Sequence, residues 1–311
     1  GTALVAAVNV LNHVAGNLGR TVKFDRTLDF SGLVTFAQLA DEFKGMIDGK
    51  VDVLVVNGAN PIYATPEWAG AKAAFAKVPF KVALSSVKDE TAEACDVILP
   101  VSHTLESFGD AWSARGVYSL QQPAMKRLPM FDSRPLGDLL IAVTKAAGGG
   151  AKWPDTFHDY LVGHWKSMHT RFGKGRDWET FWSDSLKNGG VFEDMASLTA
   201  RWTGTPAFAA SVRSGDGGFA LVLTPSNNFY DGRGANKPWL QELPDMTSKT
   251  VWGSWAEIHP DTAAKLGLKA GDPVKVETAA GSVEVPAYLY AGIRKDTVAI
   301  ALGQGHTAYG R

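Results

Sequence analysis

The first hundred residues alternate short apolar runs with segments of helical periodicity. Apolar runs of this length, rich in β-branched residues, are typical of strands buried on both faces of a parallel sheet. The predicted strands are 53–56, 80–85 and 96–100. An amphipathic helix is predicted over 36–47 and an Ala-rich helix over 67–75. Helices between strands indicate right-handed βαβ units, so the predicted fold class is α/β, a parallel sheet with flanking helices.

An apolar, Ala-rich stretch with helical spacing opens the chain. Its apolar stripe comprises Leu4, Val8, Leu11, Ala15 and Leu18. Gly19 follows the stripe and can end a helix, because glycine readily adopts the left-handed conformation found there. We predict a buried helix over this stretch.

From residue 153 to about residue 214 the chain becomes rich in tryptophan. The tryptophans are Trp153, Trp165, Trp178, Trp182 and Trp202. His158, His164 and His169 lie among them, so a haem or metal site is one alternative. His164 and His169 are five residues apart, however, and do not share a helical face as an i, i+4 pair would. We predict amphipathic helices that pack their aromatic side chains on the main body.

The pattern turns β-rich from Trp255 onward, with one short helix at 261–266. Residues 272–278 and 282–290 alternate apolar and polar positions around a Gly-containing turn, which predicts a hairpin. A last strand is predicted at 297–302. Short strands joined by glycine turns indicate a small barrel.

The length of 311 residues exceeds one ordinary domain. We predict an α/β domain over 1–150, an aromatic-rich helical insertion over 151–215, and a strand with a C-terminal β-barrel over 216–311. The formal net charge of -1 argues against an electrostatic grip on nucleic acid. No apolar run approaches the ~20 residues that span a bilayer, so membrane contact is expected only through partner subunits.

A single cysteine, Cys95, limits the redox chemistry of this segment. It cannot form an internal disulfide or hold an iron–sulfur cluster, which takes about four Cys ligands. Its place just before a predicted strand favours the role of a buried spacer, that is, a small apolar side chain that only fills space in the core. Gly1 is not an initiator Met, and Arg311 falls within an apparent motif, so we expect a part of a longer protein. Missing targeting signals then carry no weight.

Polar and glycine residues gather in loops that follow predicted strands, where open α/β sheets hold ligands. The candidate pocket residues are Asn57, Gly58, Asn60, Pro61, Ser85, His103, Gly303, Gly305 and His306. A phosphate-rich ligand needs cations, and the nearest in sequence are only Lys81, Lys88 and Arg115. A nucleotide-binding dehydrogenase is a poor alternative, because no G-x-G-x-x-G opens a helix after a strand.

Three side chains could be offered as an acid–base cluster: His103, Glu106 and Asp110. Their segment contains glycine and lacks helical continuity, so their spacing does not place them on one face. We predict a local hydrogen-bond network that holds the loop. No catalytic residue and no metal ligand is assigned.

Several segments resemble one family. Residues 257–274 resemble the C-terminal barrel domain of molybdopterin oxidoreductases, and residues 57–61 are similar to that family's GxNP turn. Residues 103–111 with 117–123, and 231–245, resemble more narrowly the large molybdopterin-like iron–sulfur subunit of alternative complex III. That assembly is a bacterial membrane complex that oxidises quinol and passes electrons to a cytochrome c or copper protein.

The resemblance implies a molybdopterin-oxidoreductase-like fold with a double-psi-type β-barrel at its C-terminal end. It implies a structural, cofactor-free part of an electron-transfer subunit in a respiratory chain. The pocket would be vestigial, and the iron–sulfur clusters would lie in a part of the subunit outside this segment. The alternative is an active molybdenum or tungsten bis-pterin oxidoreductase whose metal ligand lies before Gly1.

The same resemblance implies partners and a location. The expected partners are a multihaem cytochrome c subunit, an NrfD-like integral membrane quinol-binding subunit and other subunits of the complex. The expected location is the periplasmic side of the bacterial inner membrane.

The expectation of a larger iron–sulfur subunit can be tested on sequence alone. The continuation of the chain should contain several Cys-x-x-Cys-x-x-Cys runs, because each cluster needs about four thiolate ligands. Sequencing the complete reading frame checks this, and a frame without such runs would count against the assignment.

Overall fold

A computed structural model describes residues 2–200 and 218–310, which belong to two compact units. One unit, here the helix-rich unit, comprises Gly1–Thr35 and Pro100–Val212. The other, here the mixed-sheet unit, comprises Phe36–Leu99 and Arg213–Arg311. In the described ranges no helix is both long and apolar enough to cross a bilayer.

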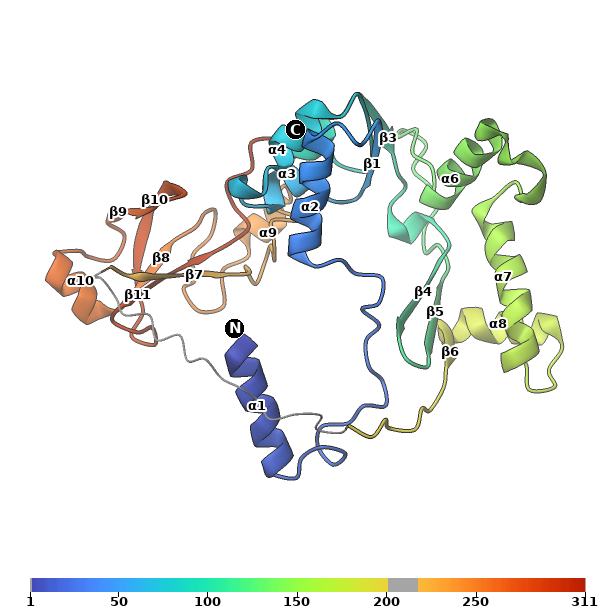
Figure 1. Ribbon diagram of the computed structural model, residues 1–311, viewed down its shortest axis with the longest axis horizontal. Helices are drawn as coiled ribbons and strands as arrows, with labels where there is room; N and C mark the ends of the chain where they lie inside the picture. Colours follow the sequence, from blue (N-terminus) through green and yellow to red (C-terminus); the bar gives the residue numbers. More distant parts are fainter. Residues whose placement is uncertain (1, 201–217, 311) are drawn as a thin grey trace. The chain divides into compact units, whose positions relative to one another are not determined.

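Three strands form the first sheet of the mixed-sheet unit, in the order β1-β2-β3. They are β1 (Val53–Asn57), β2 (Phe80–Ser85) and β3 (Val97–Pro100). Figure 1 labels the edge strands of this sheet, β1 and β3. β1 and β2 are parallel, with Val55 opposite Val82. The helices of this lobe are α2 (Phe36–Ile47), α3 (Pro61–Ala64), α4 (Ala71–Lys77) and α5 (Glu90–Glu93). The predicted α/β arrangement is confirmed here.

Helices α2 and α4 supply the buried side of this lobe. Phe43, Ala74 and Phe75 are buried, and Leu54 and Val56 of β1 pack against the same cluster. The prediction of one continuous helix over 67–75 is wrong, because Gly70 takes a left-handed φ of 79° and separates a 3₁₀ turn from α4.

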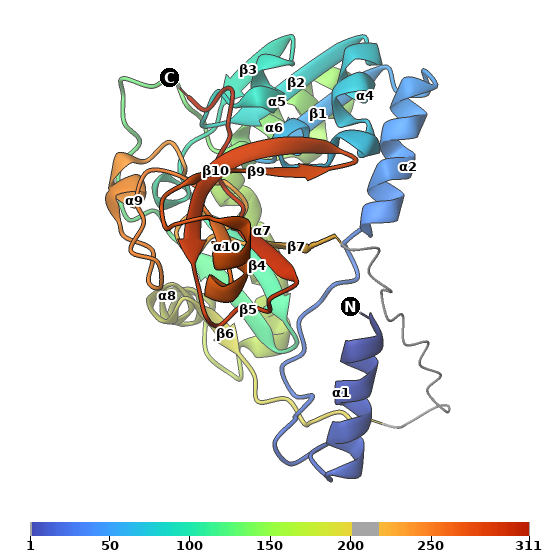
Figure 2. The same ribbon diagram turned by 90° about the vertical axis from the view of Figure 1, so that its left-hand side faces the viewer.

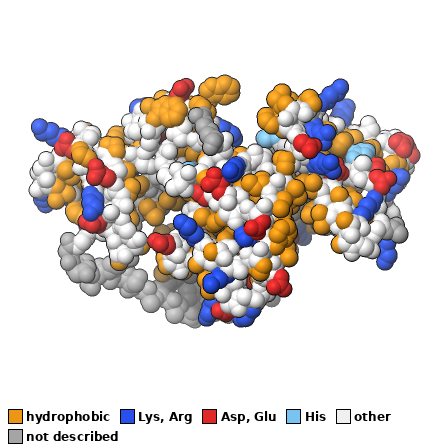
Figure 3. All heavy atoms as spheres, turned by 90° about the horizontal axis from the view of Figure 1, so that it is seen from above, with side chains coloured by type: hydrophobic (Ala, Val, Ile, Leu, Met, Phe, Trp, Pro, Cys, Tyr) orange, Lys and Arg blue, Asp and Glu red, His pale blue; other side chains and the backbone are white. Residues whose placement is uncertain are grey.

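The other side of β1 is exposed, which corrects the prediction of a strand buried on both faces. Val53 is 57% and Val55 54% exposed. Strand residues alternate between faces, and helices in the described residues cover only the face of Leu54 and Val56. Hydrophobic side chains at the surface are visible in orange in Figure 3.

A five-stranded mixed sheet forms the rest of this unit, in the order β7-β11-β8-β10-β9. The strands are β7 (Ala220–Thr224), β8 (Ala256–Ile258), β9 (Pro273–Thr278), β10 (Gly281–Leu289) and β11 (Thr297–Ala301). β9 and β10 form the predicted antiparallel hairpin, whereas β11 runs parallel to β7. The curled sheet agrees with the predicted barrel, and its double-psi crossing stays a prediction.

The short helix predicted in this region is α10 (Pro260–Leu266), which ends at Gly267. Ala263 of α10 is fully buried against Ala256 and Ile258 of β8, so the helix covers part of the curled sheet (Figure 2). A further short helix, α9 (Pro238–Glu242), lies in the connection between β7 and β8.

The helix-rich unit combines a three-stranded antiparallel sheet with helices. The strands are β4 (Gly109–Ala114), β5 (Val117–Gln121) and β6 (Gly190–Phe192). Its helices include α6 (Leu136–Thr144), α7 (Phe157–Phe172) and α8 (Trp178–Asn188). Trp165 and Phe181 are fully buried against Leu120 of β5, with Trp178 and Trp182 packed around them. Amphipathic helices that pack aromatic side chains are therefore confirmed over α7 and α8, whereas Trp202 lies outside the described residues.

The N-terminal helix α1 (Thr2–Val14) is present, but the prediction that it is buried is wrong. Leu4, Leu11 and Val14 are all more than three-fifths exposed. Helical spacing identifies the apolar positions of a segment, but it does not say which surface covers them.

Replacing either of two glycines of the helix-rich unit by alanine should change the stability of this unit, in opposite directions. A Cβ on Gly190, at φ 134°, would lie 2.1 Å from the carbonyl oxygen of Tyr118, so β6 must shift. We expect Gly190→Ala to lower the stability of this unit by about 2 kcal/mol or more. Gly163→Ala lies in α7 with nothing within 4 Å and should raise stability by about 0.5–1 kcal/mol.

Chemical denaturation followed by tryptophan fluorescence measures both changes, since Trp165, Trp178 and Trp182 lie in the core of this unit. Equal effects of the two substitutions would contradict the packing described for Gly190.

Candidate functional site

A loop at the end of the chain, Gly303–Gly310 and here called the C-terminal loop, returns from β11 to the α/β lobe of the mixed-sheet unit. The Tyr63 hydroxyl donates to the carbonyl oxygen of Gln304 at 2.9 Å. The Gly310 amide donates to the carbonyl oxygen of Lys88 at 2.7 Å. Asp89 and Tyr309 form an isolated β-bridge. The loop therefore joins the curled sheet to α3 and to the start of α5.

The carboxylate of Glu90, in the first turn of α5, is the centre of this junction. It accepts hydrogen bonds from Asn60 Nδ2 at 2.7 Å, Thr307 N at 2.7 Å and Ala308 N at 3.2 Å. His306 Nδ1 lies 3.1 Å from Oε1 of the same carboxylate. The Glu90 side chain is only 8% exposed, so these partners replace the water that a carboxylate otherwise requires.

Asn60 connects the turn after β1 to α5. Its Oδ1 accepts from the Thr91 hydroxyl at 2.7 Å and from the Thr91 amide at 3.2 Å. The same side chain donates to Glu90, so both polar ends of the amide are used. Thr91 is fully buried, which gives the turn a rigid attachment.

His306 is stacked between two tyrosines. Its ring centroid lies 3.6 Å from that of Tyr63 and 4.1 Å from that of Tyr309, with interplanar angles of 12° and 6°. His306 Nε2 lies 3.1 Å from the carbonyl oxygen of Gly232, and Tyr309 Oη accepts from the Gly234 amide at 2.7 Å. At φ 109°, Gly232 has no room for a side chain, because a Cβ would lie 2.5 Å from the Tyr63 ring.

The environment of the junction shifts the pKa of three acidic groups. Burial alone would raise the pKa of Glu90, but hydrogen bonds from Asn60, Thr307 and His306 outweigh it and lower the pKa to about 2. Burial, together with the charge of Glu90, raises the pKa of Tyr63 to about 12. Burial also raises the pKa of Asp89, whose Oδ1 accepts from the Ala92 amide and caps α5.

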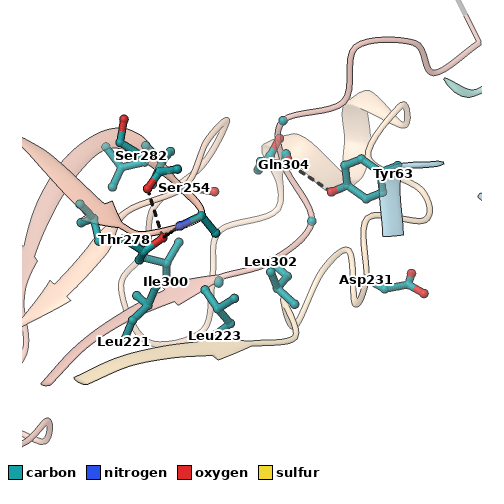
Figure 4. A pocket seen from close by; sticks show the side chains of 18 of the residues that line it. Tyr63, Leu221, Leu223, Asp231, Ser254, Thr278, Ser282, Ile300, Leu302 and Gln304 are labelled. Carbon is teal, nitrogen blue, oxygen red and sulfur yellow. Dashed lines mark hydrogen bonds between the residues drawn. The ribbon is translucent and has the colours of Figure 1, made fainter. Parts of the chain in front are cut away.

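The C-terminal loop borders two cavities. The apolar cavity measures about 670 Å³ and is lined by one face of the curled sheet, Gln304 and Tyr63. Figure 4 shows Leu221, Leu223, Ile300 and Leu302 along its floor, with the Tyr63 hydroxyl directed at Gln304. The polar cavity measures about 400 Å³ and contains mostly amide, hydroxyl and ring groups. Its lining comprises Ala235, Asn236, Pro238, Gln241, Trp252, Gln304, Gly305, His306, Thr307, Ala308 and Tyr309.

Gly305 belongs to the lining of both cavities. Its φ is 86°, and nothing lies within 4 Å of the place where a Cβ would stand. The loop therefore presents bare backbone at this point, which lets a ligand approach the main chain closely.

The structure places most of the predicted pocket residues in this unit. Asn60 and His306 both contact the carboxylate of Glu90, and Pro61 is the first residue of α3. Gly303 and Gly305 lie in the C-terminal loop. Asn57 ends β1, the Gly58 amide donates to Leu84 O, and the Ser85 hydroxyl donates to Val87 O, so these three close turns after strands.

His103 lies in the helix-rich unit. It caps a 3₁₀ turn, and its amide donates to Glu106 Oε2 at 2.9 Å, while Glu106 Oε1 accepts from the Leu128 amide. Asp110 accepts from Trp165 Nε1 at 3.1 Å. The predicted local hydrogen-bond network is therefore confirmed for His103 and Glu106, whereas Asp110 pairs with a residue of α7 that lies 55 positions away. Within the described residues no group of three or more His, Cys, Asp or Glu side chains is placed to hold a metal ion.

Sequence reasoning misses the three residues on which the junction depends: Tyr63, Glu90 and Tyr309. The partners of Glu90 in the C-terminal loop, His306 and Thr307, lie 216 and 217 residues away, so no local spacing can reveal them. The one available signal is that Asn60 and His306 both belong to the predicted pocket.

This chain is similar to several known proteins. A family model, the molydopterin dinucleotide binding domain, matches residues 238–311. The menaquinone reductase molybdopterin-binding-like subunit of Nitratidesulfovibrio vulgaris is 33% identical in an alignment of 273 positions that covers 82% of this chain and 36% of that protein. The molybdopterin-containing subunit of the arsenate respiratory reductase of Shewanella sp. is 25% identical over 90% of this chain and 42% of that protein.

Among solved structures, acetylene hydratase from Pelobacter acetylenicus superposes with a TM-score of 0.60 at 14% identity. The match covers 89% of this chain and 44% of that one, and it shows a shared fold. The chain spans less than half the length of each of these proteins.

The expectation that this segment carries no cofactor is wrong. The matched region is a dinucleotide-binding domain, and it contains every lining residue of the polar cavity except Ala235 and Asn236. The expectation rests on the small number of cations near the predicted strands. The polar cavity instead presents amide side chains, exposed backbone and an aromatic ring.

Replacing the central carboxylate should destabilise the mixed-sheet unit. We expect Glu90→Gln to cost about 3 kcal/mol at pH 7, because the pKa of Glu90 lies near 2 in the folded protein and 4.5 is its ordinary value. A lowered pKa stabilises the fold in full above the ordinary value. The difference between wild type and variant should therefore shrink as pH falls from 4.5 towards 2.

Urea denaturation at pH 7 and at pH 3 measures this difference. Glu93→Gln is the matched control, since Glu93 lies on the same helix, is about half exposed and pairs only loosely with Lys88 at 3.8 Å. A Glu90→Gln cost that is the same at both pH values would refute the electrostatic explanation.

Proposed function

Because this chain belongs to the molybdopterin oxidoreductase family, we propose that its mixed-sheet unit forms part of the binding site for a molybdopterin dinucleotide in an electron-transfer subunit. The observation that carries the proposal is the polar cavity, which falls almost entirely within the matched dinucleotide-binding region. The apolar cavity beside it shares Gln304 and Gly305.

The residues of the polar cavity fit such a group. The amides of Gln241 and Gln304 bond to each other at 2.9 and 3.4 Å, and Gln241 Nε2 also donates to the carbonyl oxygen of Ala235. A nucleobase edge would therefore bind the second amide hydrogen of Gln304. The ring of Trp252 is more than half exposed and can stack on a base. Bare backbone at Gly305 suits a phosphate or sugar. A bound molybdopterin would supply metal-binding sulfur atoms and redox chemistry.

We further propose that the subunit works in a quinol-oxidising complex of the alternative complex III type. Two observations support this proposal. Residues 231–245 resemble the large iron–sulfur subunit of that complex, and the relative from Nitratidesulfovibrio vulgaris carries the name of a menaquinone reductase subunit. The proposed partners are a multihaem cytochrome c subunit and an NrfD-like membrane subunit, on the periplasmic side of the inner membrane.

A second candidate is an active molybdenum or tungsten enzyme. It is favoured by the likeness to the molybdopterin-containing subunit of the Shewanella sp. arsenate respiratory reductase. The two candidates differ in metal content and in turnover of an oxyanion-type substrate, whereas both require a pterin.

The test is pterin and metal analysis of the complete subunit, purified with its complex. We expect about one equivalent or more of extractable pterin dinucleotide, measured by fluorescence after oxidation. Trp252→Ala should reduce it several-fold through lost stacking, whereas Trp239→Ala should not, because Trp239 is 87% exposed and does not line the cavity.

Stoichiometric molybdenum or tungsten with the pterin would favour the active enzyme over an electron-transfer part. A purified complex that contains no pterin would refute the proposed function.

A further inference from the structure

His306 faces a hydrogen-bond acceptor from each of its ring nitrogens. Nδ1 lies 3.1 and 3.2 Å from the two carboxylate oxygens of Glu90, and Nε2 lies 3.1 Å from the carbonyl oxygen of Gly232. A carbonyl oxygen can only accept, and an ionised carboxylate can only accept. Both contacts are hydrogen bonds only when both nitrogens donate, and a histidine that donates from both nitrogens is an imidazolium cation.

The rings on either side suit a cation. Tyr63 and Tyr309 stack on the two faces of His306 at 3.6 and 4.1 Å, and aromatic faces attract positive charge. The His306 side chain is 10% exposed and that of Glu90 is 8% exposed, so water screens the pair little. The low pKa of Glu90 is consistent with a carboxylate that stays ionised beside this ring.

The other charged groups around the ring come from several segments. Asp89 and Glu90 belong to the start of α5, Tyr63 to α3, and Tyr309 to the C-terminal loop. Asp231 and Arg233, in the loop after β7, pair with each other at 2.7 Å. Burial is the larger effect on both tyrosines and raises their pKa, the charge of Asp231 raises it further, and that of Arg233 lowers the pKa of Tyr309. Within the described residues, Glu90 is the only carboxylate in direct contact with the His306 ring.

We propose that the Glu90–His306 ion pair, stacked between Tyr63 and Tyr309, is a proton-dependent latch that holds the C-terminal loop against α3 and α5. When His306 loses a proton, one of its two nitrogens becomes an acceptor and faces an acceptor oxygen. The ion pair and the cation–aromatic attraction disappear together. The Thr307 and Ala308 amides, which also donate to Glu90, are then held less firmly, and the loop opens.

The latch has a consequence for ligand binding, which rests on the proposed function. Gln304 to Tyr309 form about half of the lining of the polar cavity, so an open loop dismantles one wall of it. Binding of the dinucleotide would then be favoured at pH values at which His306 is charged. The latch itself requires no ligand.

Hydrogen exchange measured by mass spectrometry on the complete subunit tests the latch. Exchange of the peptide that covers 303–310 is followed from about pH 5.5 to about pH 9.5 and corrected for intrinsic rates. We expect a single-proton step in which protection falls about tenfold or more as pH rises. Glu90→Gln should move the step to lower pH, since the neutral amide no longer stabilises the cation. His306→Gln should remove the step and leave the loop open throughout.

Two matched controls separate the latch from general destabilisation. Glu93→Gln changes the same charge on the same helix, and His259→Gln removes a histidine that only caps α10. Both should keep the wild-type step. The latch would be overturned if protection of the 303–310 peptide in wild type did not change with pH, or if the step in Glu90→Gln lay at the wild-type pH. If His306→Gln fails to fold, the shift in Glu90→Gln still decides.

Pterin content is measured in the same samples. A pH step in protein without pterin supports the latch and refutes the proposed function. Exchange protection that does not change with pH, in protein with a full equivalent of pterin, refutes the latch and leaves the proposed function intact.

Discussion

A single buried carboxylate, that of Glu90, ties together the part of the chain on which the candidate site depends. Its oxygens must be matched by donors, because an ionised carboxylate out of water is unstable alone. The donors come from Asn60 after β1 and from three residues of the C-terminal loop. The sheet of the α/β lobe and the curled sheet therefore share one polar junction, which holds the loop that borders both cavities.

The junction combines structural and ligand-binding roles in one short loop. Gly303–Gly310 makes the contacts that hold it in place and also lines both cavities. Its side facing Glu90 is used for structure, whereas Gly305 leaves backbone open on the cavity side. A change in the charge of His306 can thus affect the polar cavity directly, because His306 belongs to the loop that lines this cavity.

The break at Gly70 is a local effect, but the corrections for α1, β1 and the cofactor share another cause: each concerns what lies next to a segment. Apolar spacing identifies α1 and β1, yet both keep apolar side chains exposed in the described structure. Cation counting near the strands favours an empty site, whereas the matched region presents amides, a tryptophan ring and backbone. Neighbours that arrive from distant sequence cannot be counted locally.

Local physics determined much of this protein from sequence alone. β-Branched runs, helical spacing and glycine stops identified the parallel strands, the hairpin, α10 and the aromatic helices, because those signals depend on residues close together in the chain. The residues 57–61 and 257–274 also pointed to the family. Only tertiary structure decided that Glu90 meets His306 across 216 residues and that two tyrosines enclose that ring. Pairing at that separation depends on how whole elements pack, and no short segment of the sequence specifies that packing.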